Sequence, residues 1–339
     1  MRRAVRAWAG RSLLFLSAAA LSGCAALRGP QAALRPAGPV AGIELGLIER
    51  SLGIMLIVAA AVYIPLAVII LRYRARPGRA SRPPQTEGNA AIEALWTVVP
   101  FVLLLVLAIP TIRDTFRLAA TPKGDPVAVT VVGHQWWWEF DYPAYGIVTA
   151  DEMHIPVGET IDVTLRSADV IHAFWVPALA GKQDTIPGLD LHMWLAAQRP
   201  GLYPGQCGEF CGLAHSQMRF DVIAQPPAAF AAWVSSLQHP VVTPATPQAA
   251  QGQKLFTSLG CAGCHTIDGT SAQGKVGPNL TGLANRHVIV AGTLANNPTD
   301  LGMWLHNPQQ FIPGTVMPSF PNLTPTQFQD LTAYLEGLK

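Results

Sequence analysis

Charged side chains are scarce in this sequence: Asp, Glu, Lys and Arg make up 13% of its 339 residues, whereas half of the residues are hydrophobic. This scarcity, with a mean hydropathy of +0.28, excludes an ordinary soluble enzyme and a disordered chain, and it predicts membrane segments. Cysteine is scarce as well. Five cysteines are an odd number, which excludes a framework built from disulfide pairs alone.

The net charge of +2 conceals two opposed halves of the chain. Residues 1–112 hold 12 basic and 4 acidic side chains, whereas residues 113–339 hold 11 and 17. The excess of acid lies within residues 113–240, and residues 241–339 hold four of each sign. An acidic middle region can attract a basic soluble partner by long-range steering, although it can also be only a solvated surface.

The first residues have the three regions of an export signal. Four arginines precede the apolar stretch 13–21, and Ser22 and Gly23 precede Cys24. The stretch predicts a signal peptide of the lipoprotein type over residues 1–23, with a lipid attached to the Cys24 thiol. The alternative is a simple signal peptide with an incidental cysteine.

Two uncharged apolar runs follow, at about 51–71 and 94–112, and both reach the roughly 20 residues that a membrane-spanning helix needs. They predict a transmembrane hairpin over residues 42–113. Its connection carries five arginines against Glu87, so the positive-inside rule places it in the cytoplasm. We therefore expect a bacterial inner-membrane protein with both termini and everything after Arg113 on the periplasmic face.

Short β-rich runs punctuated by Gly and Pro occupy residues 114–226 and predict an all-β sandwich. The expected strands are 127–132, 136–142, 159–165, 173–176 and 218–223.

Soft metal ligands gather near the end of this region. Cys207 and Cys211 lie four residues apart, His215 and Met218 follow, and His172 lies upstream. Thiolate, imidazole and thioether together favour copper. Zinc would accept two Cys and two His but gains little from the Met. A Cys207–Cys211 disulfide is the other alternative, because an exported domain is in an oxidising compartment.

Four segments of this region resemble subunit II of haem–copper cytochrome c oxidases, and the resemblance runs from the first membrane helix to about residue 224. The segments are Cys-x-Glu-x-Cys-x-x-x-His-x-x-Met (207–218), Val-Ile-His-Ala-Phe-Trp-Val-Pro (170–177), Gly-Lys-Gln-Asp-Thr-Ile-Pro-Gly (181–188) and Gly-His-Gln-Trp-Trp-Trp (133–138). The resemblance implies a cupredoxin-like sandwich with a mixed-valence centre of two Cu ions. Its implied ligands are the bridging thiolates of Cys207 and Cys211, the imidazoles of His172 and His215 and, more weakly, Met218 and the Glu209 carbonyl.

The same resemblance implies three further roles. The Glu209 side chain would bind Mg or Mn at the contact with subunit I, Trp136 would form the electron-input surface, and Glu93 would stand at the mouth of a proton pathway. A lone Glu at a helix start is often only a partner of the helix dipole. We expect the remaining aromatic and imidazole side chains to be structural or on the surface, namely Trp137, Trp138, His134, His154 and His192.

A second exported domain is expected over residues 251–339, after a helix and Pro-rich linker at 227–250. It opens with Cys261-x-x-Cys264-His265, the attachment motif of c-type haem: two thioethers and an axial imidazole. A redox-active Cys261–Cys264 disulfide is the structural alternative.

The second axial ligand of a haem in this domain is expected to be a methionine, since Met/His ligation closes the iron to substrates. Met303 and Met317 compete. We favour Met317, because residues 313–318 resemble the Met loop of class I cytochromes c, and residues 277–280 resemble the loop at the haem edge. This implies an all-α class I cytochrome c domain. Its last helix, capped by Thr324, should pack on its first.

The expected protein is therefore the electron-input subunit of a respiratory oxidase, passing electrons from a cytochrome c or other periplasmic donor through haem c and copper to subunit I. Oxygen reduction coupled to proton translocation would take place in subunit I, because no acid–base or nucleophilic machinery for oxygen chemistry occurs here. Subunit III is a further expected partner, and no nucleic acid is expected. The alternatives are the small subunit of a copper-containing nitric oxide reductase and a membrane-tethered copper-binding protein.

Overall fold

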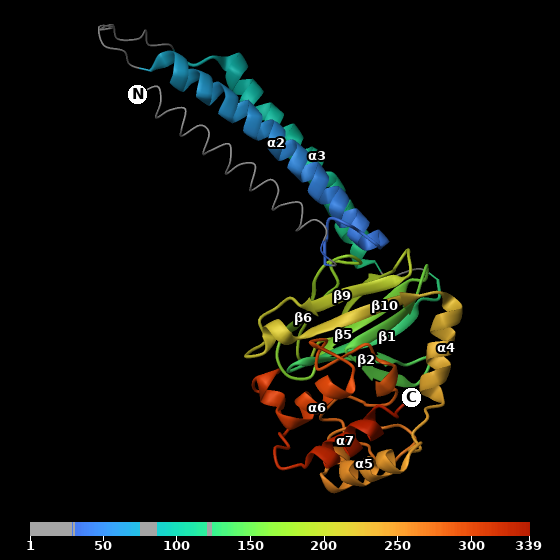
Figure 1. The fold of residues 1–339 in the computed structure, drawn as a ribbon. Coiled ribbons are helices and arrows are strands. Elements are labelled where there is room, and N and C mark those ends of the chain that lie inside the picture. Colours follow the sequence, from blue (N-terminus) through green and yellow to red (C-terminus); the bar gives the residue numbers. More distant parts are fainter. Residues whose placement is uncertain (1–28, 30, 75–86, 121–123) are drawn as a thin grey trace. The chain divides into compact units, whose positions relative to one another are not determined.

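The computed structural model describes residues 29, 31–74, 87–120 and 124–339 (Figure 1). The predicted signal peptide, Cys24 and most of the arginine-rich connection lie outside these residues. The described chain forms two compact units. One is a helical hairpin over residues 42–120, and the other joins the residues just before it to residues 124–339.

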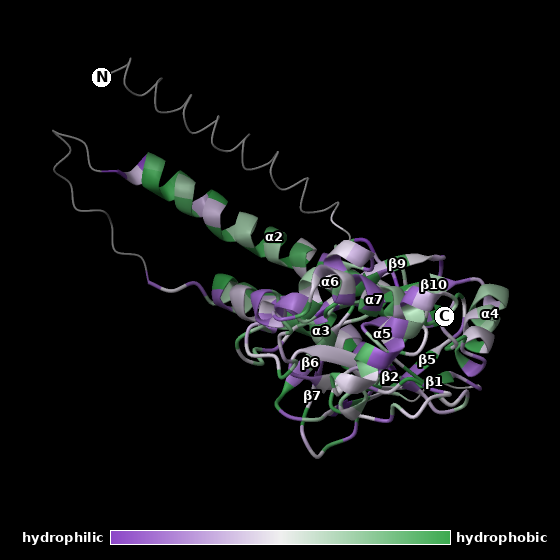
Figure 2. Ribbon diagram, turned by 60° about the horizontal axis from the view of Figure 1, so that its bottom comes forward, coloured by the Kyte–Doolittle hydropathy of each residue, from purple (hydrophilic) through white to green (hydrophobic). Residues whose placement is uncertain are grey.

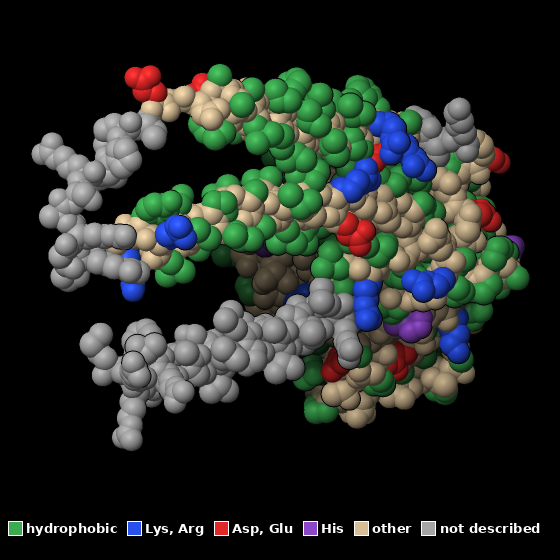
Figure 3. Space-filling view, turned by 90° about the horizontal axis from the view of Figure 1, so that it is seen from above, with side chains coloured by type: hydrophobic (Ala, Val, Ile, Leu, Met, Phe, Trp, Pro, Cys, Tyr) green, Lys and Arg blue, Asp and Glu red, His purple; other side chains and the backbone are tan. Residues whose placement is uncertain are grey.

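Two long helices form the hairpin, α2 (Pro39–Tyr73) and α3 (Ala90–Ala119). Both are long and apolar enough to cross a membrane, as the hydropathy colouring of the ribbon indicates (Figure 2), and hydrophobic side chains gather on them (Figure 3). Pro65, Pro100 and Pro110 stand inside these helices, where lipid-facing helices tolerate them. The two expected spans are thus confirmed as the apolar cores of longer helices.

Polar contacts stabilise the hairpin at two places. The Asn89 side chain accepts hydrogen bonds from the backbone N–H groups of Ala91 and Ile92, which caps α3. Near the other end of the hairpin, buried Asp114 of α3 pairs with Arg50 of α2 at 3.5 Å and with Arg113 at 3.0 Å. The buried carboxylate is therefore neutralised by cations from both helices.

The domain that follows is a sandwich of two five-stranded sheets. In spatial order, the first sheet holds β3 (Ile147–Ala150), β2 (Trp137–Tyr142), β1 (Val127–His134), β5 (Ile161–Ser167) and β8 (Leu191–Leu195). The second holds β4 (Glu152–Pro156), β10 (Arg219–Gln225), β9 (Gly201–Cys207), β6 (His172–Trp175) and β7 (Gln183–Thr185). The pairs β1·β5 and β4·β10 are parallel and the others antiparallel.

Aromatic side chains from both sheets fill the core of the sandwich. Trp138 and Phe140 of β2 meet Phe174 of β6 and Phe220 of β10, with ring centroids 4.7–5.8 Å apart. All four are completely or almost completely buried. The sequence identified the strands that carry these rings, because they alternate or are strongly apolar. It missed β3, β4, β7, β8 and β9, which are short or rich in polar residues and Gly.

The last part of the chain is a small helical domain. Helix α4 (Pro227–Gln238) leads to α5 (Pro247–Ser258), α6 (Pro298–His306) and α7 (Pro325–Leu335), with one short ribbon of β11 (Val288–Ile289) and β12 (Leu294–Ala295). Single 3-10 turns occur at His215–Gln217, Cys261–Gly263, Leu283–Asn285 and Pro308–Gln310.

Helices α5 and α7 pack closely, as the sequence predicted. A side chain on Gly252 would collide with the backbone carbonyl of Asp330, so the two helices touch through backbone at this point. The predicted cap of α7 is present as a capping box of Thr324 and Gln327.

The prediction of an extended linker up to residue 250 was wrong at its end. Helix α5 starts at Pro247, because the Thr246 side chain caps it and a proline is favourable in a first helical turn. The linker is also paired with the C-terminus, since Val241 and Lys339 exchange two backbone hydrogen bonds.

Candidate copper centre and haem cavity

The predicted copper ligands come from three places in one sheet of the sandwich. His172 begins β6, Cys207 ends β9, and the loop from β9 to β10 supplies Cys211, His215 and Met218. His172 and Met218 are fully buried, and the two cysteines are at most 5% exposed. Because the neighbouring strands are paired, the ligands are held before any metal binds.

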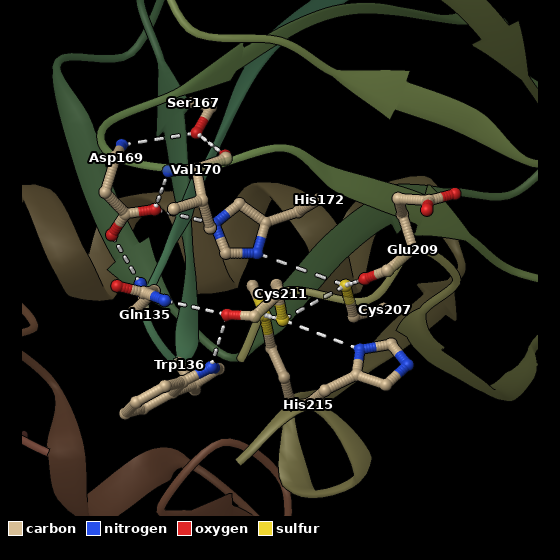
Figure 4. Close-up of polar contacts among 11 residues, drawn as sticks. Gln135, Trp136, Ser167, Asp169, Val170, His172, Cys207, Glu209, Cys211 and His215 are labelled. Atoms are coloured by element: carbon tan, nitrogen blue, oxygen red, sulfur yellow. Dashed lines mark hydrogen bonds and ion pairs between the residues drawn. The ribbon is translucent and has the colours of Figure 1, made fainter. Parts of the chain in front are cut away.

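The ligand atoms converge on one point (Figure 4). The two cysteine Sγ atoms lie 3.8 Å apart, which is beyond the roughly 2.05 Å of a disulfide. The Cys207 sulfur is 4.0 Å from His172 Nδ1, and the Cys211 sulfur is 3.5 Å from His215 Nδ1. Met218 Sδ lies 3.8 Å from the Cys211 sulfur, and the Glu209 carbonyl oxygen lies 3.2 Å from the Cys207 sulfur.

The two thiols oppose each other's ionisation, because their sulfur atoms are in contact. The contact with Cys211, together with the hydrogen bond to His172, lowers the pKa of Cys207 despite burial. The same sulfur contact and burial then raise the pKa of Cys211. Two adjacent thiolates thus require positive charge between them, which soft, thiophilic copper ions supply.

Asp169 orients the His172 imidazole. Its Oδ1 lies 2.8 Å from His172 Nε2, so that Nδ1 faces Cys207. Burial opposes ionisation of this carboxyl, but hydrogen bonds from His172 and from the N–H groups of Val170 and Gln135 lower the pKa of Asp169. Sequence reasoning missed this residue, although a carboxylate three positions before a ligand His is a recognisable orienting partner.

The side chains of Gln135 and Trp136 hold the backbone of Cys211 in place. Gln135 Nε2 and Trp136 Nε1 both donate hydrogen bonds to the Cys211 carbonyl, at 2.7 and 3.0 Å. The indole of Trp136 is therefore one hydrogen bond away from the backbone of a candidate copper ligand, while it is only 7% exposed. Trp138, by contrast, is a core residue, and Trp137 stacks on His134 at 4.1 Å.

The Glu209 side chain points away from the thiols. It is 45% exposed and pairs with Lys182 at 3.3 Å, and Asp184 contacts the same lysine at 3.7 Å. The carbonyl oxygen of Glu209 thus contacts Cys207, whereas its carboxylate lies at the surface beside Lys182. Glu93 lies elsewhere, in the first turn of α3.

A cavity of about 360 Å³ marks the predicted haem site. It is lined by Cys261, Cys264, His265 and Met317, with apolar walls from the helical domain. Met317 packs against the core of this domain, whereas Met303 is 44% exposed and does not line the cavity. Of the two methionines, Met317 is thus the one placed to reach a haem iron.

The side chain of His265 is held for axial ligation. Its Nδ1–H donates to the Pro278 carbonyl at 2.8 Å, which leaves Nε2 free for iron. Burial lowers the pKa of His265 and keeps its imidazole neutral. A side chain on Gly277 would come within 2.5 Å of the imidazole, so this position requires glycine.

Arg286 gives a second test of the fit of haem to the cavity. The guanidinium donates to the carbonyl oxygens of Asn279 and Thr281, but its buried Nε has no partner within the described chain. A buried cation with a free donor beside the cavity suits a haem propionate. The sequence alone gave no signal for Arg286.

The remaining histidines are structural or on the surface. His134 is part-buried and stays neutral, because burial lowers its pKa to about 4. His154 stacks on Trp233 at 4.3 Å, and His192 lies on β8 at the edge of its sheet.

Comparison with known proteins gives matches along most of the chain. Three family models match: cytochrome c oxidase subunit II transmembrane domain over residues 36–113, its periplasmic domain over 147–225, and cytochrome c over 249–339. Cytochrome c oxidase subunit 2 of Alkalihalophilus pseudofirmus is 41% identical over 313 residues, covering 91% of this chain and 90% of that protein. The subunit 2 of Bacillus sp. PS3 is 37% identical over 360 residues, covering 100% of this chain and 99% of the relative. Among solved structures, the periplasmic domain of subunit II of the Bradyrhizobium japonicum oxidase is 34% identical over 34% of this chain and 96% of its own, with a TM-score of 0.33.

Proposed function

The chain belongs to the cytochrome c oxidase subunit II family, and from this premise we propose how its own residues serve electron input to a haem–copper oxidase. Cys207 and Cys211 would bridge two Cu ions, and His172 and His215 would each bind one through Nδ1. The Met218 thioether and Glu209 carbonyl would be weak ligands. A bound pair of coppers accepts and releases one electron at a time.

The fold keeps this exchange fast by holding the ligands still. His172 is fixed by Asp169, and the Cys211 backbone is fixed by Gln135 and Trp136. The other ligands stand on paired strands of a sandwich whose core is aromatic. Ligands that cannot move keep the same geometry in both redox states, so little reorganisation opposes transfer.

The helical domain would hold haem c through the thioethers of Cys261 and Cys264 and the axial ligands His265 and Met317. His265 is oriented by Pro278, and Arg286 offers its free Nε–H to a propionate. A haem with both axial positions filled by protein carries electrons and does not bind oxygen. We propose that electrons reach this domain from a cytochrome c or other donor and pass through the copper centre to subunit I.

Further roles follow from the positions of two carboxylates. The exposed Glu209 side chain is free to bind Mg or Mn shared with subunit I, and Glu93, at the start of α3, would stand at a proton pathway. Subunit III would complete the complex. The predicted signal peptide and lipidated Cys24 would place both termini and both redox domains on the periplasmic face of the inner membrane.

Two other functions were open from the sequence. A nitric oxide reductase small subunit would use the same copper loop, so only the partner's substrate separates it from an oxidase. A copper-binding protein with no redox partner would have no use for a buried indole hydrogen-bonded to a ligand backbone between copper and haem sites. The close relatives are oxidase subunits, which favours the oxidase.

The convergence of two thiols, two imidazoles and a thioether in one buried cluster carries the proposal. Copper analysis and absorption spectroscopy of the purified chain test it. We expect two Cu per chain and a mixed-valence spectrum that disappears in Cys207→Ser but persists in Ser216→Ala, a change in the same loop away from the ligand atoms. One copper per chain, or a spectrum unchanged by Cys207→Ser, contradicts it.

A further inference from the structure

Two neighbouring carboxylates lie outside the copper cluster and are not among the proposed haem ligands, yet both are buried, and Asp151 lines the haem cavity. Asp151 and Glu152 stand where the chain passes from β3 in one sheet to β4 in the other, and they are 4% and 1% exposed. Burying an ionisable group is costly unless it is hydrogen-bonded. The partners of these two carboxylates therefore show what their burial achieves.

Glu152 receives its hydrogen bonds from the helical domain. Its Oε1 accepts from the backbone N–H groups of His287 and Val288, at 2.5 and 2.9 Å. The His287 ring lies 3.7 Å from the same oxygen. Within the copper domain, Oε2 faces the His154 imidazole at 3.6 Å. One side chain thus binds a segment 135 residues further along the chain.

Asp151 connects the two domains through its two oxygens. Oδ1 accepts from the N–H of Trp138, which lies two residues after Trp136, at 3.0 Å. Oδ2 accepts from the N–H of Ala291 at 3.1 Å. The Ala291 carbonyl in turn accepts from the N–H of Arg219, the residue after Met218. Ala291 is therefore held at both its N–H and its carbonyl by the copper domain.

The segment that is held has an unusual backbone. Val290 and Ala291 have φ values of +58° and +53°, a region that a β-branched residue adopts only where surrounding contacts impose it. Two such contacts hold Ala291: its N–H donates to the Asp151 carboxylate, and its carbonyl accepts from the N–H of Arg219. This backbone conformation is thus tied to the docked arrangement.

The same segment is a wall of the haem cavity. Arg286, Ile289, Val290 and Ala291 line the cavity from the helical domain, and Trp136 lines it from the copper domain. The Met loop also reaches Trp136, since a side chain on Gly314 would come within 2.8 Å of the indole ring. Holding residues 287–291 in place therefore also holds this wall of the cavity next to the Trp136 indole, which is hydrogen-bonded to Cys211.

We infer that Asp151 and Glu152 are positioning residues. By accepting hydrogen bonds from residues 287–291 they hold the haem domain against the copper domain, with Trp136 as part of the cavity wall. We call these two carboxylates the latch. The latch recognises main-chain N–H groups, so it fits one backbone conformation of residues 287–291. It also leaves Trp136 covered, so that a soluble donor meets the haem domain and not this indole. The inference rests on the proposed function for its consequence, but the docking itself can be measured without electron transfer.

Amide hydrogen exchange of the full chain in its purified complex tests the latch. In Asp151→Ala/Glu152→Ala, we expect the peptide covering residues 286–296 to exchange at least about tenfold faster, because the N–H groups of His287, Val288 and Ala291 lose their side-chain acceptors and a net hydrogen bond contributes up to about that factor. Peptides of α5 and α7 should exchange as in the unaltered chain. The transfer of one electron from reduced haem to oxidised copper, after flash reduction, should slow.

Three variants serve as controls. Glu152→Gln keeps an acceptor oxygen for both N–H groups and should retain most of the protection. Asp190→Asn removes an exposed carboxylate that pairs only with Arg166 among the described contacts, and it should change nothing. If the double variant does not fold, Asp151→Asn alone removes one of the two acceptors and should give a smaller, equally localised increase in exchange.

The outcomes separate the latch from the proposed function. Absence of the copper or haem spectrum in the unaltered chain overturns the proposed function but leaves the exchange data readable. Intact spectra with equal exchange of residues 286–296 in the double variant and in Asp190→Asn overturn the latch. Faster exchange spread equally over the sandwich also overturns it, because this shows that the carboxylates only stabilise the copper domain.

Discussion

The two candidate cofactor sites of this chain are built in opposite ways. The candidate copper ligands lie within about 4 Å of their neighbours, all but the part-buried His215 are buried, and they come from one sheet of a finished sandwich and the loop between two of its strands. The haem ligands surround a cavity of about 360 Å³ and are half-buried or exposed, and another domain supplies part of the wall. The copper domain is thus complete without its metal, whereas the helical domain is completed by its cofactor.

The difference follows from the elements that carry the ligands. Paired strands with an aromatic core fix side chains to within a fraction of an ångström, which suits a centre whose geometry must not change. The three short helices pack around one small hydrophobic core and leave a cavity beside it. The haem would supply the missing interior of that domain, so removal of each cofactor should affect stability very differently.

Loss of haem attachment should have the largest effect. In Cys261→Ser/Cys264→Ser, haem is no longer covalently held, and the apolar side chains that line the cavity lose the surface that would cover them, which should remove much of the stability of a small domain. We expect calorimetry to show that the helical domain no longer melts cooperatively, while the sandwich transition stays. A haem-free protein with both transitions intact would contradict the claim that the helical domain depends on its cofactor for stability.

Loss of the proposed axial methionine should have the second largest effect. Met317→Ala should abolish the methionine-to-iron charge-transfer band and destabilise the helical domain by about 2 kcal/mol, because a packed side chain and an iron bond are both lost. Met303→Ala is the matched control, as its side chain does not line the cavity. Loss of the band only in Met303→Ala would show that the ligand was wrongly assigned.

The contact between α5 and α7 offers a smaller test. Gly252→Ala forces a methyl group against the Asp330 carbonyl, and overpacking of this kind costs ~1–3 kcal/mol. Thermal melting of the helical domain should shift down by several degrees. Gly302→Ala in α6 meets no atom within 4 Å and should be neutral or slightly stabilising. Equal effects of the two changes would contradict the packing described.

A pH dependence should be the smallest effect. Burial raises the pKa of Asp151 to about 7, although hydrogen bonds from Trp138 and Ala291 and the charge of Arg286 oppose the shift, while Glu152 adds to it. The protonated form is therefore favoured in the folded unit. Protonation of Asp151 therefore adds to the free energy of unfolding. This addition is fully present below pH 3.8, the ordinary pKa of the carboxyl, and is lost as the pH rises through about 7.

The melting temperature of the unaltered chain relative to Asp151→Asn should accordingly be higher at pH 5 than at pH 8. Burial opposes ionisation of Glu152, but the nearby His154 imidazole and the hydrogen bonds from the 287–288 backbone lower its pKa, so its contribution changes only below its ordinary 4.5. A difference in melting temperature that does not vary between pH 5 and 8 contradicts the shift.

Residues that carry chemistry in fixed spacing could be predicted from the sequence. The Cys207–Met218 loop, the Cys261–His265 motif and the fused domain order all follow from local patterns. His172 was found by resemblance, since its partner lies 35 residues away. Residues that act through long-range contacts could not be found: Arg286, Asp151 and Glu152 look like ordinary surface charges until the fold brings them to their partners.

Electron flow through the copper centre is tested most directly by Cys207→Ser in the complete oxidase, supplied with a reduced donor. We expect the haem of the fused domain to become reduced at the normal rate and to stay reduced, while oxygen consumption falls to background. Continued oxygen consumption in Cys207→Ser, with the haem turning over, would contradict the account.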